Sequence, residues 1–200
     1  MDFHIFWRGP INDKLYLSAH SFLFTQPLDK ARLHLWIDSS HFPDGLPEDY
    51  TKNEFAAPLV SRPMNKYITI HAWDQEAELA YLYGGLRTPT LAQKKQQRVG
   101  LEALSDEARF LILNCNGGIY LDADVLLLKD MSPFYDAGVE FAYQCSNTEM
   151  YNIAILRLFP GSTVARRILD GAKAREAEIM QRKLREEFER QQGNGKRGRG

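Results

Sequence analysis

The sequence predicts an α/β protein, because segments with the character of strands alternate with segments that have helical periodicity. Its 200 residues, 44% of them hydrophobic and 12% aromatic, suffice for one substantial core, so a single main domain is expected. A third observation is the pair Asp122 and Asp124, which interrupts an otherwise apolar, strand-like stretch. The first two observations predict the fold class, and the third indicates where to look for a functional site.

The N-terminal residues predict the first two elements. The segment FHIFW at residues 3–7 is aromatic and β-branched and is followed by Gly9 and Pro10, which is typical of a strand and a turn. Apolar residues then recur at helical spacing behind Asn12, a good N-cap residue, until Pro27 closes the segment. We therefore expect a strand and then a helix.

Further strands are expected at residues 33–37 and 67–73, where RLHLWID and YITIHAW are rich in β-forming residues, and at residues 119–121 and 139–143. Residues 39–63 are rich in Pro and Asp and predict a long irregular connection. The histidines inside the strands are expected to be hydrogen-bonded structural residues without a chemical role, namely His4, His34 and His71.

A helix is expected to begin at Ser105, because serine is a favoured N-cap and Asp106 and Glu107 suit the positive end of the helix dipole. Asp106 and Arg109, three residues apart, are neighbours on one face of this helix. They are either an exposed ion pair worth only ~0.3–0.5 kcal/mol or a functional pair. The buried face is expected to comprise Ala108, Leu111, Ile112 and Cys115.

The apolar stretch at residues 119–128 contains Asp122 and Asp124, which project from the same side of an extended chain. Two neighbouring carboxylates repel each other and are costly to bury without a cation or a donor. Gly117 and Gly118 can turn the chain sharply just before them and leave room for a close ligand. Taken alone, the pattern favours a D-x-D turn that only links two segments, and the alternative is a strand end that binds a divalent metal.

Charge and cysteine content exclude several classes of function. Residues 173–200 hold nine Lys/Arg against five Glu, whereas the preceding residues hold sixteen basic and twenty-one acidic side chains. An acidic body argues against a nucleic-acid-binding surface. Two cysteines are too few for a disulfide framework and are not spaced as zinc ligands. No apolar segment approaches the ~20 residues of a membrane span, and residues 1–10 lack the features of a signal peptide.

The segment SDEARFLILNCNGGIYLDADVLLLKDM carries the pattern S-D-x-x-R-(aromatic) followed by G-G-I-Y-x-D-x-D. It resembles the DXD-containing sugar-binding region of glycosyltransferase family 32, which includes fungal α-1,6-mannosyltransferases, animal α-1,4-galactosyl- and N-acetylglucosaminyltransferases and clostridial glucosylating toxins. FHIFWRGP resembles the first strand of such enzymes, and YNIAILRLFPGSTVARRIL resembles the segment after the DXD strand. The resemblance implies a GT-A-type nucleotide-sugar-binding fold with a central mixed, mostly parallel sheet flanked by helices.

The resemblance also implies the composition of the site. Asp124, together with Asp122, would hold Mn²⁺ or Mg²⁺, whose charge neutralises the diphosphate of the leaving nucleotide. Asp106 and Arg109 would orient the donor sugar, and Trp7 would either stack on the nucleobase or simply pack in the core. No catalytic residue is assigned. The implied donor-binding residues are Trp7, Asp106, Arg109, Tyr120, Asp122 and Asn152.

The C-terminal part of the chain departs from the family pattern. We expect residues 1–171 to form the GT-A-like domain, residues 172–192 a charged helix and residues 193–200 a disordered basic tail. Because the family continues into a region that completes the donor site, the chain is expected to be a fragment, a truncated gene product or a divergent member.

The expected function is metal-dependent transfer of a sugar from a UDP- or GDP-sugar to a glycan, lipid or protein acceptor. One alternative is a non-catalytic member that binds donor or partner. The other is a phosphatase of the haloacid dehalogenase type, but such phosphatases usually have Thr or Val where Leu126 stands. A location in the Golgi lumen is expected only if the resemblance to eukaryotic members holds and an anchor lies upstream.

Overall fold

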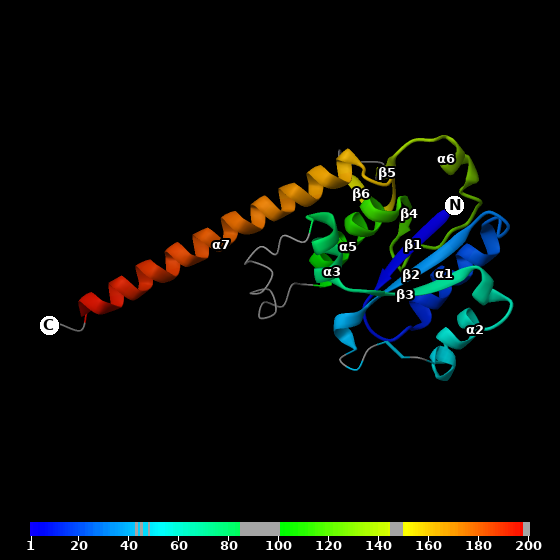
Figure 1. Cartoon of the computed structure of the whole chain (residues 1–200), viewed down its shortest axis with the longest axis horizontal. Helices are drawn as coiled ribbons and strands as arrows, with labels where there is room; N and C mark the ends of the chain where they lie inside the picture. Colours follow the sequence, from blue (N-terminus) through cyan, green and yellow to red (C-terminus); the bar gives the residue numbers. More distant parts are fainter. Residues whose placement is uncertain (43, 45, 48, 85–100, 145–149, 198–200) are drawn as a thin grey trace.

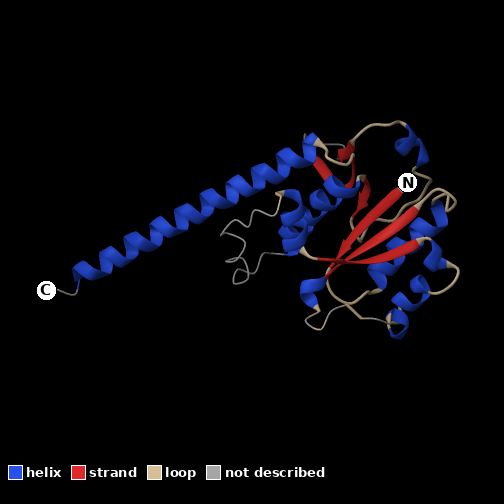
Figure 2. Cartoon of the chain, viewed as in Figure 1, coloured by secondary structure: helices blue, strands red, loops and turns tan. Residues whose placement is uncertain are grey.

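The structure is a computed structural model, and it describes residues 1–42, 44, 46–47, 49–84, 101–144 and 150–197. A six-stranded sheet with helices on both faces forms its body (Figures 1 and 2). The strands are β1 (Asp2–Trp7), β2 (Arg32–Asp38), β3 (Ile68–Trp73), β4 (Gly118–Leu121), β5 (Phe141–Gln144) and β6 (Tyr151–Leu158). The α-helices are α1 (Asp13–Thr25), α2 (Ala56–Val60), α3 (Gln75–Leu82), α5 (Leu101–Asn116), α6 (Ser132–Asp136) and α7 (Thr163–Arg197).

The sheet is mixed and mostly parallel, as the sequence predicts. Its strand order is β3-β2-β1-β4-β6-β5. The pairs β1–β2, β2–β3 and β1–β4 are parallel, whereas β6 runs antiparallel to both β4 and β5. The carboxyl ends of β1, β2 and β4 therefore meet at one edge of the sheet, where open α/β sheets bind their ligands.

Two apolar clusters cover the two faces of this sheet. Phe3 and Ile5 of β1 point into one cluster with the buried face of α1, whereas Phe6 points into the other with α5, in line with the two-residue period of a strand. The predicted cap of α1 is confirmed, because Asn12 Oδ1 accepts a hydrogen bond from the Leu15 amide. The expected α/β class is therefore confirmed by its order of elements and its packing.

The predicted start of α5 at Ser105 is wrong, because this helix begins at Leu101. The local signals of a cap are present at Ser105, but Leu104 is buried in the same cluster as Ala108 and Leu111. These residues are four and seven apart and form one helical stripe, so burial of Leu104 favours a further turn of helix. Ser105 is consequently a residue of the helix interior and not its cap.

Other boundaries agree with the predictions in part. The strand expected at residues 119–121 is confirmed by β4, which ends directly before Asp122, whereas the strand expected at residues 139–143 begins only at Phe141 as β5. The connection at residues 39–63 contains α2 and two short 3₁₀ helices, Ser39–His41 and Tyr50–Lys52. Asp38 and Asp49 cap these 3₁₀ helices with their side chains.

Gly117 and Gly118 turn the chain from α5 into β4, with φ angles of 68° and 95°. A Cβ on Gly118 would lie 2.4 Å from the Asp2 carbonyl oxygen, and one on Gly117 would lie 2.5 Å from the Pro160 ring. The sharp turn predicted for this pair is thus confirmed. The room left by the absent side chains is filled by the neighbouring β1 backbone and by Pro160, and not by a ligand.

The three strand histidines are hydrogen-bonded, as predicted. The Trp36 indole donates to His4 Nδ1 at 3.1 Å, and His34 Nδ1 lies 2.9 Å from His71 Nε2. His4 is buried, and its ring stacks on that of His34. These contacts hold β1, β2 and β3 together on one face of the sheet.

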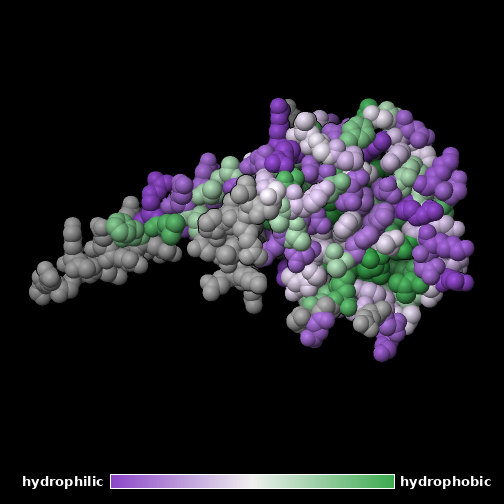
Figure 3. Space-filling view, in the orientation of Figure 1, coloured by the Kyte–Doolittle hydropathy of each residue, from purple (hydrophilic) through white to green (hydrophobic). Residues whose placement is uncertain are grey.

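Helix α7 leaves the body of the protein as one long rod (Figure 1). It begins at Thr163, within the predicted domain, and continues to Arg197, beyond the predicted end of helix at residue 192; residues 198–200 of the predicted tail lie outside the described part. Most of its described surface is hydrophilic (Figure 3), although Leu184 and Phe188 are exposed. Among the described residues, no helix has the length and the apolar character that a membrane span needs.

Candidate donor-binding site

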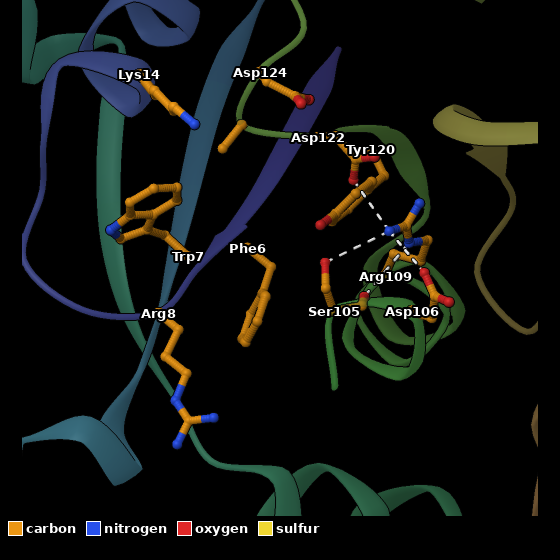
Figure 4. Close-up of a pocket in the computed structure, with 11 residues that line it drawn as sticks. Phe6, Trp7, Arg8, Lys14, Ser105, Asp106, Arg109, Tyr120, Asp122 and Asp124 are labelled. Atoms are coloured by element: carbon orange, nitrogen blue, oxygen red, sulfur yellow. Dashed lines mark hydrogen bonds and ion pairs between the residues drawn. The ribbon is translucent and has the colours of Figure 1, made fainter. Parts of the chain in front are cut away.

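A pocket of about 410 Å³ opens where β1 and β4 end. Its lining comes from four segments: the end of β1 and the residues after it, the first turn of α1, the middle of α5, and the end of β4 with the turn that follows (Figure 4). The lining residues are Phe6, Trp7, Arg8, Lys14, Ser105, Asp106, Arg109, Tyr120, Asp122, Ala123 and Asp124. The fold therefore brings together residues that lie more than 100 positions apart in the sequence.

Most of the residues singled out in the sequence lie in this one pocket. Trp7 and Asp124 share it, as do Asp106, Arg109, Tyr120 and Asp122. Asn152 is the exception: it is an exposed residue of β6, and its side-chain oxygen accepts a hydrogen bond from the Ala154 amide at 2.7 Å. The pocket geometry thus gives no support to the donor contact expected of Asn152.

Arg109 organises the wall that α5 and β4 contribute. Its Nη2 lies 2.9 Å from Asp106 Oδ1 and 3.1 Å from Asp122 Oδ1, and its Nη1 donates to the Ile153 carbonyl at 2.7 Å. The Arg109 side chain is only 6% exposed, although that of Asp106 is 55% exposed, so the pair is not a fully exposed one. Arg109 is instead the buried cation of a three-residue cluster, in which it faces the exposed Asp106 and the partly buried Asp122.

Tyr120 forms the inner part of this wall. It is fully buried in the cluster that contains Phe6, and the Arg109 guanidinium lies 5.1 Å from the centre of its ring. Burial raises the pKa of Tyr120 to about 12, so the phenol stays neutral at physiological pH. Tyr120 therefore both fills the core and supports Arg109.

Asp122 directly follows β4, and its backbone forms a turn in which the Val125 amide donates to the Asp122 carbonyl at 3.0 Å. The D-x-D turn suggested by the sequence is thus present in the backbone. Among the described residues, however, no backbone amide donates to the carboxylates of Asp122 or Asp124. By contrast, Asp130 accepts from the Ser132 amide at 2.8 Å. The turn is therefore held by a backbone hydrogen bond and not by these carboxylates, of which Asp122 is paired with Arg109.

The electrostatics of the turn favour a cation. Desolvation raises the pKa of Asp122; Arg109 lowers it, and the neighbouring Asp124 and Asp106 raise it. Asp124 is exposed and lines the pocket together with Asp122 (Figure 4). A positive ion near these two oxygens would relieve the repulsion that disfavours ionised Asp122.

Trp7 forms part of the opposite wall. It is half-buried, and its indole Nε1 donates to the Pro10 carbonyl at 2.9 Å, which fixes the orientation of the ring. Arg8 follows it, and its Nε lies 3.3 Å from Asp38 Oδ2. Because Trp7 is both half-buried and a lining residue, it packs partly against the core and partly against the open pocket.

Sequence reasoning missed Phe6, Arg8, Lys14, Ser105 and Ala123 as lining residues. Arg8 and Lys14 stand close to the end of a predicted strand in WRGPINDK, but the sequence does not distinguish them from other surface cations. Ser105 was noticed only as a helix cap. Phe6 and Ala123 have no polar chemistry that would distinguish them in a sequence.

Comparisons with known proteins agree with this geometry. The sequence profile described as "Glycosyltransferase sugar-binding region containing DXD motif" matches residues 59–140. Comparison with curated proteins gives no match. Among solved structures, "PaToxG Glycosyltransferase" superposes with a TM-score of 0.55 and 15% identity over 84% of this chain. A galactosyltransferase LgtC, in complex with donor and acceptor sugar analogues, gives a TM-score of 0.48 and 17% identity over 79% of this chain.

The chain spans 58% of the PaToxG glycosyltransferase and 57% of LgtC. The profile match includes α5, β4 and the D-x-D turn, which supply most of the acidic wall of the pocket. The structural match to the PaToxG glycosyltransferase covers 84% of this chain and so extends beyond the residues of the profile match. The predicted resemblance to DXD-containing glycosyltransferases is therefore confirmed, in sequence by residues 59–140 and in architecture by a GT-A-type fold.

Proposed function

We propose that this protein is a metal-dependent glycosyltransferase that moves a sugar from a UDP- or GDP-sugar to a glycan, lipid or protein acceptor. The observation that carries the proposal is the convergence of Trp7, the Asp106–Arg109–Asp122 cluster and Asp124 in one pocket at the carboxyl edge of the sheet. An aromatic face, fixed hydrogen-bonding groups and a pair of carboxylates are the groups that a nucleotide sugar with a divalent ion requires.

The carboxylates suit a hard divalent ion held jointly with its substrate. Asp122 and Asp124 would hold Mn²⁺ or Mg²⁺, which when bound supplies positive charge to the departing nucleoside diphosphate. Among the described residues, no group of three or more His, Cys, Asp or Glu side chains could enclose an ion. Ions such as Mg²⁺ are commonly held by one or two carboxylates together with substrate phosphates, so a two-aspartate site fits this chemistry.

The remaining residues would bind and orient the donor. Arg109 is fixed by two carboxylates and a carbonyl, so the oxygens of Asp106 and Asp122 are held rigidly and can accept hydrogen bonds from sugar hydroxyls. The hydrogen bond from Trp7 to the Pro10 carbonyl keeps the indole in place for stacking on a nucleobase. Phe6 and Tyr120 close the inner side of the pocket and exclude water from it.

Isothermal titration with a panel of UDP- and GDP-sugars, with and without Mn²⁺, tests the proposal. We expect one donor to bind more tightly with Mn²⁺ present, and we expect transfer or hydrolysis of that donor in a product assay. Binding without turnover would instead favour a non-catalytic donor-binding protein. Failure of every donor to bind would refute the proposed function.

A further inference from the structure

We propose that Lys14 binds the diphosphate of the nucleotide from the wall opposite the aspartates, and that it gives the site an affinity for nucleoside diphosphates that needs no metal ion. This inference rests on the proposed function and adds a residue and a property to it. Lys14 lines the pocket, and Figure 4 shows its ammonium group directed into it, at the same end as Asp124. An anion in that space would lie between the lysine and the aspartate pair.

Lys14 differs from the other cations of the pocket in having no described partner. Arg8 is held by Asp38 at 3.3 Å, and Arg109 is held by Asp106 and Asp122. Among the residues that the structure describes, no carboxylate lies within ion-pair distance of the Lys14 ammonium. Its charge is therefore available to a ligand, whereas the charges of the two arginines are already used to fix the walls.

The position of Lys14 in α1 is unfavourable for a helix without a ligand. It lies in the first turn, where the helix dipole is positive and acidic residues such as the preceding Asp13 are preferred. Residues that oppose a local rule without a structural partner are expected at functional sites. A bound phosphate would reverse the sign of this effect, because the helix terminus and the lysine would then both attract the same anion.

The metal site makes such a cation useful. Asp122 already shares Arg109 with Asp106, so the only carboxylate of the D-x-D pair free of described ion pairs is the exposed Asp124. A divalent ion held by so few protein oxygens depends on the phosphates for the rest of its shell. A lysine across the pocket can hold those phosphates before an ion arrives, because a charge-assisted hydrogen bond to phosphate does not require the metal.

The test is titration of UDP and GDP, and of uridine and guanosine, into wild-type protein and Lys14→Ala in EDTA and in Mn²⁺. We expect wild-type protein to bind one diphosphate in EDTA, and Lys14→Ala to bind it about tenfold or more weakly, since a hydrogen bond to a charged group contributes that much affinity. Binding of the nucleoside should be unchanged by the substitution. Lys14→Arg should retain most of the affinity, and Lys66→Ala, an exposed lysine outside the pocket, should match wild type.

Three results would overturn the inference. If Lys14→Ala binds the diphosphate as tightly as wild type in EDTA, Lys14 is not a phosphate ligand. If the wild type binds the diphosphate only in Mn²⁺, the metal-independent affinity does not exist, while the proposed function stands. If neither nucleotide binds under either condition, the proposed function and this inference fail together. Thermal unfolding of each variant checks that the fold is retained, which is expected because Lys14 is exposed.

Discussion

The Nη2 atom of Arg109 lies 3.1 Å from Asp122 Oδ1 and joins the middle of α5 to the end of β4. The same nitrogen lies 2.9 Å from Asp106 Oδ1, so one buried cation holds two carboxylates. Desolvation raises the pKa of Asp122, and the guanidinium acts against this by lowering it. The acidic wall of the pocket therefore depends on Arg109 for its charge balance and for its geometry.

Replacement of Arg109 with Ala is expected to lower the free energy of unfolding by about 1–3 kcal/mol, because it leaves the Ile153 carbonyl and the partly buried Asp122 without their donor. Urea unfolding at pH 7 measures this effect. Arg175→Ala is the control, since its pair with Glu178 is 72% and 67% exposed and should change stability by less than about 0.5 kcal/mol. Equal effects of the two substitutions would mean that Arg109 forms only an ordinary helical ion pair.

Asp124→Asn is expected to abolish the stabilisation that Mn²⁺ and a nucleotide provide together. Ligands that bind only the native state stabilise it by about 2.7 kcal/mol at a hundredfold excess over Kd, which a thermal shift detects readily. The protein without ligand should be equally stable or slightly more stable, because a negative charge beside Asp122 is removed.

Asp130→Asn is a matched control, because Asp130 holds Ser132 in a turn outside the pocket. It should leave the response to Mn²⁺ and nucleotide intact. A variant Asp124→Asn that keeps this response and melts at a lower temperature would instead identify Asp124 as a structural residue of its turn.

The sheet could be predicted because its signals are local. Strand β1 alternates between two buried faces, and Asn12 and Pro27 mark the ends of the next helix, so each boundary depends on neighbouring residues alone. The start of α5 could not be predicted in this way. The cap signals at Ser105 are genuine, but burial of Leu104 against the core decides the boundary, and that contact exists only in the folded protein.

The residues of the site likewise fall into those that the sequence predicts and those that only the folded structure identifies. The spacing of Asp106, Arg109, Asp122 and Asp124 indicated a shared site, and these residues do share a pocket. Lys14 could not be identified, because a single lysine after a strand has no pattern until the fold places it across from Asp124. Asn152 was inferred only from the family resemblance, and nothing in its own sequence context requires it to face the pocket.

Trp7→Ala is expected to weaken nucleotide binding about tenfold, because stacking of a base on an aromatic ring contributes ~1–3 kcal/mol. Trp7→Phe separates the two features of the indole: it removes the hydrogen bond to the Pro10 carbonyl but retains an aromatic face. It should therefore lose less affinity than Trp7→Ala in titrations with UDP and GDP. If both variants bind as tightly as wild type, Trp7 is a core residue and contributes nothing to the donor.

The last prediction concerns acid stability and His4. Desolvation lowers the pKa of His4 from 6.5 to about 3, with a smaller contribution from His34 in the same direction, so the ring is neutral in the native state. Below pH 6.5 the His4 ring is protonated in the unfolded chain, whereas in the native protein it stays neutral until the pH approaches 3. Stability from this group is therefore fully present above pH 6.5 and is lost as the pH falls toward 3, at about 1.4 kcal/mol per pH unit.

His71 acts in the same direction, because desolvation and then His34 lower its pKa, whereas Asp2 opposes the shift at His4. His4→Gln removes the buried titrating ring and keeps an acceptor for the Trp36 indole. Urea unfolding of both proteins between pH 4 and pH 7 should give a shallower fall in stability for the variant, with the largest difference in slope below pH 6. Parallel pH profiles would show that His4 is protonated alike in the native and unfolded states, and that its burial does not control acid unfolding.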